Sequence, residues 1–112
     1  MKKDRTDKNA LAQTLVLKCG VRPYLSGCTY LAEAIELYSG EEQTPMSVYR
    51  SIAERHSVKP KTVMRNIAYA ISKCGDMHNK LSDMMGIKIH PDEIHNGLVI
   101  AYLAFKLKTT VA

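Results

Sequence analysis

Two imidazoles and two carboxylates lie within the six residues His90-Pro91-Asp92-Glu93-Ile94-His95. Side chains of these types bind metal ions or exchange protons with a substrate. The spacing differs from the His-Glu-x-x-His pattern, and a third metal ligand is not evident. Pro91 would also place Asp92 and Glu93 at the start of a helix, where carboxylates complement the helix dipole without a metal. We therefore expect no metal site here.

Other patterns typical of catalysis are missing from the sequence. It has no nucleophile elbow, no phosphate-binding glycine loop and no identifiable acid–base pair. Its hydroxyl residues Thr44, Ser47, Ser51 and Ser57 are interpreted as helix caps and turn residues. We therefore expect neither enzymatic activity nor a bound cofactor.

The formal net charge of +5 is concentrated in one stretch of the chain, residues 43–75. The remaining residues hold equal numbers of basic and acidic side chains. Within the stretch Glu54 is opposed by Arg50, Arg55, Lys59, Lys61, Arg65 and Lys73. Such a concentration is typical of a surface that contacts phosphates, although a solvated basic face is the alternative.

Length and composition describe one globular domain, with 112 residues, of which 46% are hydrophobic and 24% charged. The apolar run from Leu98 to Phe105 is too short to span a membrane, and the first seven residues lack the apolar stretch of a secretory signal. We expect a cytoplasmic protein that makes no membrane contact. Cys19, Cys28 and Cys74 form no CxxC pair, which favours reduced, buried thiols.

Prolines and glycines divide the chain into six expected helices, and no convincing strand is present. The fold class is therefore all-α, a compact six-helix domain over residues 9–108, preceded by a flexible tail or linker remnant at residues 1–8. Asp7 or Asn9 is the expected cap of the first helix. The expected helices cover about residues 9–19, 27–39, 45–56, 60–74, 77–85 and 91–108.

The third and fourth expected helices have the spacing of a helix-turn-helix at about residues 45–74. Ala53 is small enough for the helices to cross closely, Val58 would fill the corner, and Val63 would pack the second helix onto the first. His56 and Ser57 depart from the usual pattern, which has an apolar residue and often glycine at these positions. The sequence thus predicts that the helix after Pro60 carries a polar, cationic outer face.

A helix of this kind fits the major groove of duplex DNA. There an Arg can bond guanine, and an Asn can bond adenine, through two hydrogen bonds, so Arg65 and Asn66 are the expected readers. The other basic side chains of the stretch are expected to contact phosphates, which positions a protein without reading sequence. These expected phosphate contacts are Arg50, Arg55, Lys59, Lys61 and Lys73.

The sequence also resembles a known family, the C-terminal DNA-binding effector domain of stage zero sporulation protein A, the master transcription factor of bacterial sporulation. The resemblance extends from about Leu15 to Leu107. It is carried by the segments Gly20–Pro23, Ser26–Ile35, Val48–Ala53, Val63–Ile71 and Ala104–Leu107.

The resemblance implies a six-helix domain whose fourth helix reads the major groove, with protomers bound in tandem on DNA at promoters. RNA polymerase is a further candidate partner. The Glu-Arg pair by which the family reads bases corresponds here to Met64 and Arg65, and neighbouring family positions to Thr62, Ala68 and Tyr69. Because Met64 can make only apolar contacts, we expect DNA binding with an altered target sequence. The expected base contacts are Thr62, Met64, Arg65, Asn66 and Tyr69.

The last expected helix is apolar on every side. A stripe containing Leu98, Tyr102 and Phe105 would satisfy the core, which leaves Ile100, Leu103 and Leu107 for a contact between protomers. Complete burial of this helix is the alternative. The sequence therefore predicts a sequence-specific DNA-binding transcription regulator that acts as a homodimer or as tandem protomers. The alternative is a helical protein-interaction module that keeps the fold without specific DNA binding.

Overall fold

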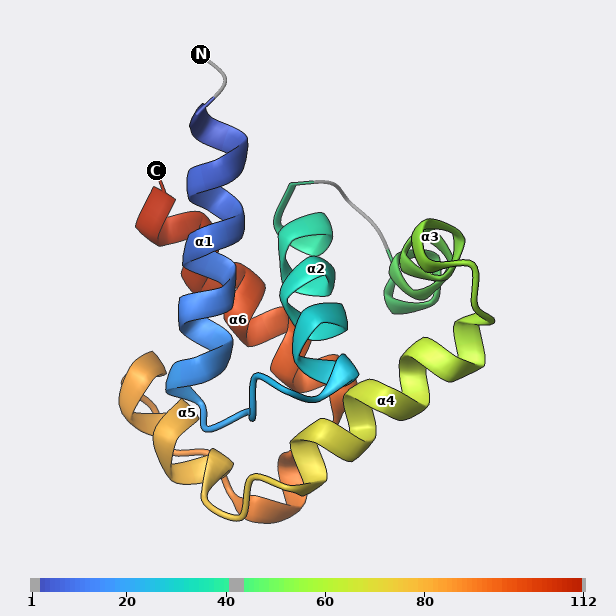
Figure 1. The fold of residues 1–112 in the computed structure, drawn as a ribbon. Helices are drawn as coiled ribbons and strands as arrows, with labels where there is room; N and C mark the ends of the chain where they lie inside the picture. Colours follow the sequence, from blue (N-terminus) through green and yellow to red (C-terminus); the bar gives the residue numbers. More distant parts are fainter. Residues whose placement is uncertain (1–2, 41–43, 112) are drawn as a thin grey trace.

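The computed structural model describes residues 3–40 and 44–111, and these residues form helices joined by short turns (Figure 1). No strand occurs within them. The all-α prediction with six α-helices is confirmed. The helices are α1 (Lys3–Lys18), α2 (Ser26–Gly40), α3 (Pro45–His56), α4 (Pro60–Ser72), α5 (Met77–Met85) and α6 (Asn96–Val111), with a 3-10 turn η1 (Pro91–Glu93) before α6.

Local sequence explains most of the helix ends. The Thr44 hydroxyl accepts a hydrogen bond from the Ser47 N–H at 3.2 Å, and Pro45 occupies the first turn of α3. Pro60 opens α4 in the same way, after an extended Lys59. Gly86 ends α5 in the left-handed conformation, with φ at 73°.

Two helices begin elsewhere than the sequence predicts. Helix α1 starts at Lys3, so residues 3–8 of the expected tail are helical, while residues 1–2 lie outside the described residues. Asn9 therefore lies within α1 and does not cap it, and its amide donates to Glu36 of α2 at 3.1 Å. Helix α6 starts at Asn96, since the backbone turns extended at Ile94 after the short turn that Pro91 opens.

Helix α2 occupies the centre of the fold and contacts α1, α3, α4 and α6 (Figure 1). Its Leu31 and Ile35 are completely buried, as are Ile52 of α3 and Ile67 of α4. Removing these side chains from water is the main term that stabilises the domain. Helix α2 therefore supports α4 from its buried side.

The face that α6 buries differs from the predicted one. Ile100, Leu103 and Leu107, which the sequence predicts at a protomer interface, are 0% exposed and belong to the core. Phe105, expected in the core, is 60% exposed. An interface through these three residues is therefore wrong for the folded chain, and the alternative of burial describes them. An all-round apolar helix carries no polar face to indicate which side points outward.

Candidate nucleic-acid interface

The turn between α3 and α4 is closed by backbone hydrogen bonds and an apolar plug. The Val58 N–H donates to the Ala53 carbonyl at 3.0 Å. Ala53 and Val63 are buried, and Val58 is partly buried against the core. The packing roles that the sequence assigns to these residues agree with their positions. The turn thereby holds α3 and α4 in contact.

Ser57 adopts the left-handed conformation at the end of α3, with φ at 55° and ψ at 44°. Among the residues that the structure describes, Ser57 is the only non-glycine residue with a positive φ. A non-glycine residue in this region costs on the order of 1 kcal/mol or more. This position is the one at which the sequence departs from the usual glycine, and the backbone keeps the glycine-type conformation.

Gly27 sets the approach of α2 to α4. A Cβ atom at this position would overlap the backbone carbonyl of Asn66 and lie 2.7 Å from the Cβ of Ala70. The two helices therefore pack with backbone nearly against backbone, which only glycine permits. Sequence reasoning missed this role. The available signal is a glycine inside an expected helix, where helix propensity disfavours it.

Asn96 holds the other flank of α4. Its Nδ2 donates to the Met64 carbonyl of α4 at 3.0 Å and lies 3.3 Å from the Tyr49 hydroxyl of α3. One amide at the start of α6 therefore contacts both helices of the pair. Sequence reasoning gave Asn96 no role, because its partners are distant in the chain.

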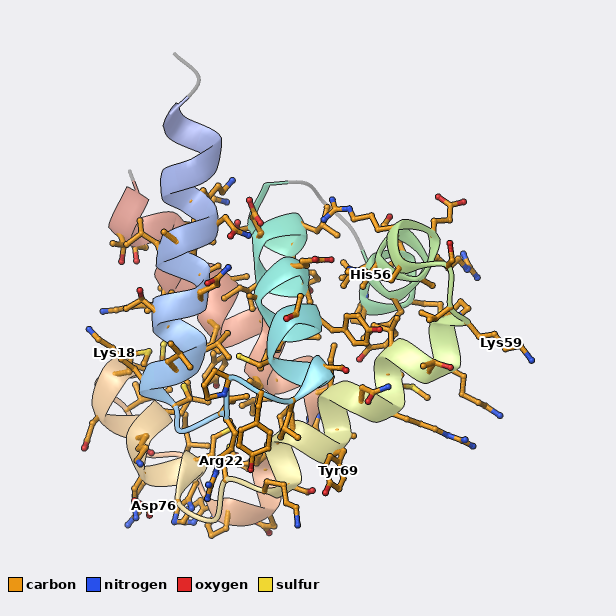
Figure 2. The ribbon with its side chains drawn as sticks, in the orientation of Figure 1. Lys18, Arg22, His56, Lys59, Tyr69 and Asp76 are labelled. Carbon is orange, nitrogen blue, oxygen red and sulfur yellow. The ribbon has the colours of Figure 1, made fainter. Side chains whose placement is uncertain are left out.

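The outward face of α4 carries exposed polar and cationic side chains. Lys61 and Arg65 are exposed, and Tyr69 is 52% exposed. Figure 2 shows Lys59 and Tyr69 pointing away from the body of the molecule. The Lys73 ammonium group lies 5.3 Å from the centre of the Tyr69 ring, a cation–π contact. An elongated surface of positive charge follows α4 from its first turn to its last.

The other expected base-reading residues lie on the flanks of this face. Thr62, Met64 and Asn66 are each partly buried. The Asn66 Nδ2 donates to the Thr62 carbonyl at 2.8 Å, so one of its two N–H groups is used within α4. The second N–H group and the Oδ1 atom of Asn66 form no hydrogen bond within the described residues, and these are the two groups that a contact with adenine uses. Arg65 is thus the expected reader that the fold presents most openly.

Met64 lines an open groove of about 650 Å³ beside α4. Arg65 and Ile71 of α4 lie along one side of the groove, and Pro91 and Ile94 along the other. This groove could not be predicted from the sequence, because it forms between α4 and a segment from Pro91 to Gly97 that is distant from most of α4 along the chain.

The five side chains that are expected to contact phosphates are all exposed, but one of them is already paired with a carboxylate. Arg55 lies 3.5 Å from the Glu33 carboxylate of α2, and His56 lies 3.1 Å from the same group. The His56 ring also packs edge-on against Tyr30 at 5.1 Å. Glu33 therefore holds the end of α3 against α2 and offsets part of the positive charge of α3. Arg50, Lys59 and Lys61 have no ion pair within 4.0 Å among the described residues.

The histidine–carboxylate segment serves local turns. The His90 backbone N–H donates to the Glu93 carboxylate at 2.8 Å, and the Leu98 N–H donates to His95 Nδ1 at 3.3 Å. Both bonds satisfy backbone groups at helix ends. Within residues 3–40 and 44–111, no cluster of three or more His, Cys, Asp or Glu side chains has a geometry suited to a metal ion.

The three cysteines are free thiols near the α1–α2 turn and the end of α4. Burial raises the pKa of Cys19 to about 12, with a smaller contribution from Cys74. Burial also raises the pKa values of Cys28 and Cys74. These thiols are therefore protonated at neutral pH and are poor nucleophiles.

Comparison with known families assigns the chain. The family described as sporulation initiation factor Spo0A C terminal matches residues 12–107. The chain belongs to this family. Its members are DNA-binding effector domains of a sporulation regulator. The family is not a family of enzymes. No curated protein and no solved structure matches the chain. No helix of the described residues has both the length and the apolar character needed to cross a membrane.

Proposed function

We propose that this domain binds duplex DNA in a sequence-specific manner and regulates transcription, with α3 and α4 as its helix-turn-helix. Helix α4 lies in the major groove, where Arg65 is the principal base contact, supported by Thr62, Met64, Asn66 and Tyr69. The observation that carries the proposal is the exposed face of α4, which presents Lys61, Arg65 and Tyr69 while α2 packs behind it.

The geometry of α4 agrees with this role. Its 13 residues form a rod about 20 Å long, and the diameter of a helix with its side chains, about 10–12 Å, fits a major groove about 12 Å wide. Arg50, Lys59, Lys61 and Lys73 are exposed around it and reach the phosphates that border the groove. Arg55 makes a weaker contribution because Glu33 already pairs with it. The proposed DNA binding places the protein with the chromosome, in the cytoplasm or nucleoid.

The interaction-module alternative used the last helix together with the basic face. The burial of Ile100, Leu103 and Leu107 removes the apolar part of that surface, and the basic face is shared by both interpretations. Tandem protomers and RNA polymerase are the partners that we propose on promoter DNA. Contacts with either partner would have to use other residues of the surface.

Salt dependence of duplex binding tests the proposal. The logarithm of the binding constant should fall linearly with the logarithm of salt concentration, with a slope that corresponds to several phosphate contacts. Lys61→Gln should make the slope shallower by about 0.9, because one contact is lost. Lys108→Gln, which removes an exposed charge at the end of α6, should leave the slope unchanged. Salt-insensitive binding, or no binding to any duplex, would contradict the proposal.

A further inference from the structure

The C-terminal end of α4 is bordered by cations that come from outside the basic stretch. Arg22, in the turn between α1 and α2, and Lys80, in α5, are both exposed. Burial raises the pKa of the Cys74 thiol, just beyond α4, and the positive charges of Arg22 and Lys80 offset part of this rise. The Lys80 Nζ lies 3.5 Å from the position that a Cβ on Gly20 would occupy, which brings α5 to the end of α1.

These two cations join Lys73 at the same end of α4. Figure 2 shows Arg22 and Tyr69 on the lower side of the molecule, whereas Lys59, at the opposite end of α4, projects from the right edge. Neither Arg22, Lys73 nor Lys80 has an ion pair within 4.0 Å in the part of the chain that the structure describes. The nearby Asp76 accepts a hydrogen bond from Asn79 at 2.7 Å. Three cations therefore border this end of α4 without a carboxylate partner among the described residues, and one of them, Lys73, also contacts the Tyr69 ring.

We propose that Arg22, Lys73 and Lys80 form a second phosphate-binding cluster, which contacts the DNA strand opposite to that contacted by Lys59 and Lys61. This inference rests on the proposed function. The two ends of α4 are about 20 Å apart, more than the groove width of about 12 Å, so in the proposed arrangement α4 crosses the groove and each end meets the phosphates of a different strand. Cations at both ends then hold the helix from both sides, and Arg65 and Tyr69 lie between them. The charge of residues 43–75 alone does not indicate this cluster, because Arg22 and Lys80 lie outside that stretch and come near α4 only in the folded chain.

Charge-removing variants of the intact chain test the cluster. Arg22→Gln and Lys80→Gln should each weaken binding at 0.1 M salt on the order of five- to tenfold, equally for selected and mixed-sequence duplexes. Each change should also make the salt slope shallower by about 0.9. Arg22→Lys retains the charge and should bind nearly as well as the original chain, which separates charge from packing. Lys108→Gln is the matched control for net charge, and circular dichroism confirms folding of every variant.

Phosphate ethylation interference locates the contacts. The phosphates whose interference disappears in Arg22→Gln should lie on the opposite strand from those lost in Lys61→Gln. Loss of phosphates on the same strand as Lys61→Gln overturns the proposed arrangement. If Arg22→Gln and Lys80→Gln bind like Lys108→Gln while Lys61→Gln is impaired, the cluster is wrong and the proposed function stands. If the original chain shows no salt-dependent duplex binding, both proposals fail.

Discussion

Helices α4 and α6 both pack against the central α2, but they differ in what marks their outer side. In α4 the exposed positions include Lys61 and Arg65, and Lys73 follows at its C-terminal end, so the charge of these side chains is enough to identify the outer surface. In α6 the exposed Phe105 and the buried Leu103 are both apolar, so residue type does not separate surface from core. A cationic face can therefore be assigned from sequence, whereas a face within an all-apolar helix requires the packing partners.

The largest expected effect comes from a Glu on the buried side of α6, compared with a Glu on its exposed side. Leu103→Glu places a carboxylate in the core and should cost roughly 4 kcal/mol or more, a large share of the stability of a domain of this size. Phe105→Glu, on the exposed side, should cost less than about 1 kcal/mol. Urea unfolding measures both free energies. A folded, monomeric Leu103→Glu variant would show that α6 presents its other face, as at a protomer interface.

The contact between α2 and α4 gives the next largest effect. Gly27→Ala should destabilise the domain by about 1–3 kcal/mol, because the added methyl meets the Asn66 backbone and Ala70. Helix propensity alone would favour alanine only slightly at this second residue of α2, so a loss of stability is due to the steric clash. Duplex affinity of the folded variant should fall as well, since α4 must shift.

Gly75→Ala is the matched control for this prediction, because a Cβ at Gly75 meets no atom within 4 Å. Its free energy of unfolding and its duplex affinity should stay close to those of the original chain. If Gly27→Ala is as stable as Gly75→Ala and binds equally well, α2 does not hold α4 in the described position.

The turn before α4 gives the smallest effect. Ser57→Gly relieves the left-handed backbone, and this gain is partly offset by the greater freedom of glycine in the unfolded chain, so we expect stabilisation of under about 1 kcal/mol. The melting temperature should rise by a few degrees. Ser51→Gly, within α3, should lower it because glycine disfavours helix interiors. A lower melting temperature for Ser57→Gly would contradict the assigned strain.

The elements predicted from sequence are those that local signals define. Thr44-Pro45, Pro60 and Gly86 mark the ends of α3, α4 and α5, and the spacing of Ala53, Val58 and Val63 anticipates how the α3–α4 turn is filled. The predicted start of α1 is wrong: the helix begins at Lys3, and Asn9, a good cap residue, lies within it and bonds across to α2. Local capping preference cannot reveal such a tertiary contact.

The supporting contacts of the candidate interface could not be predicted for the same reason. Gly27, Glu33 and Asn96 reach α3 or α4 across more than twenty residues of sequence. Their types are ordinary in isolation and acquire a role only when the helices meet. The outward residues of α4 were predictable because they need no partner within the chain.

Selection of bound sequences from a random duplex pool tests the central claim most directly, that the outer face of α4 reads bases. The original chain should enrich a defined sequence, and Arg65→Ala should lose preference at one base position and about 1–3 kcal/mol of affinity for that sequence. Lys61→Ala should enrich the same sequence with uniformly lower affinity, because it contacts phosphate. Enrichment of no sequence by the original chain, or of an unchanged sequence by Arg65→Ala, would contradict the account.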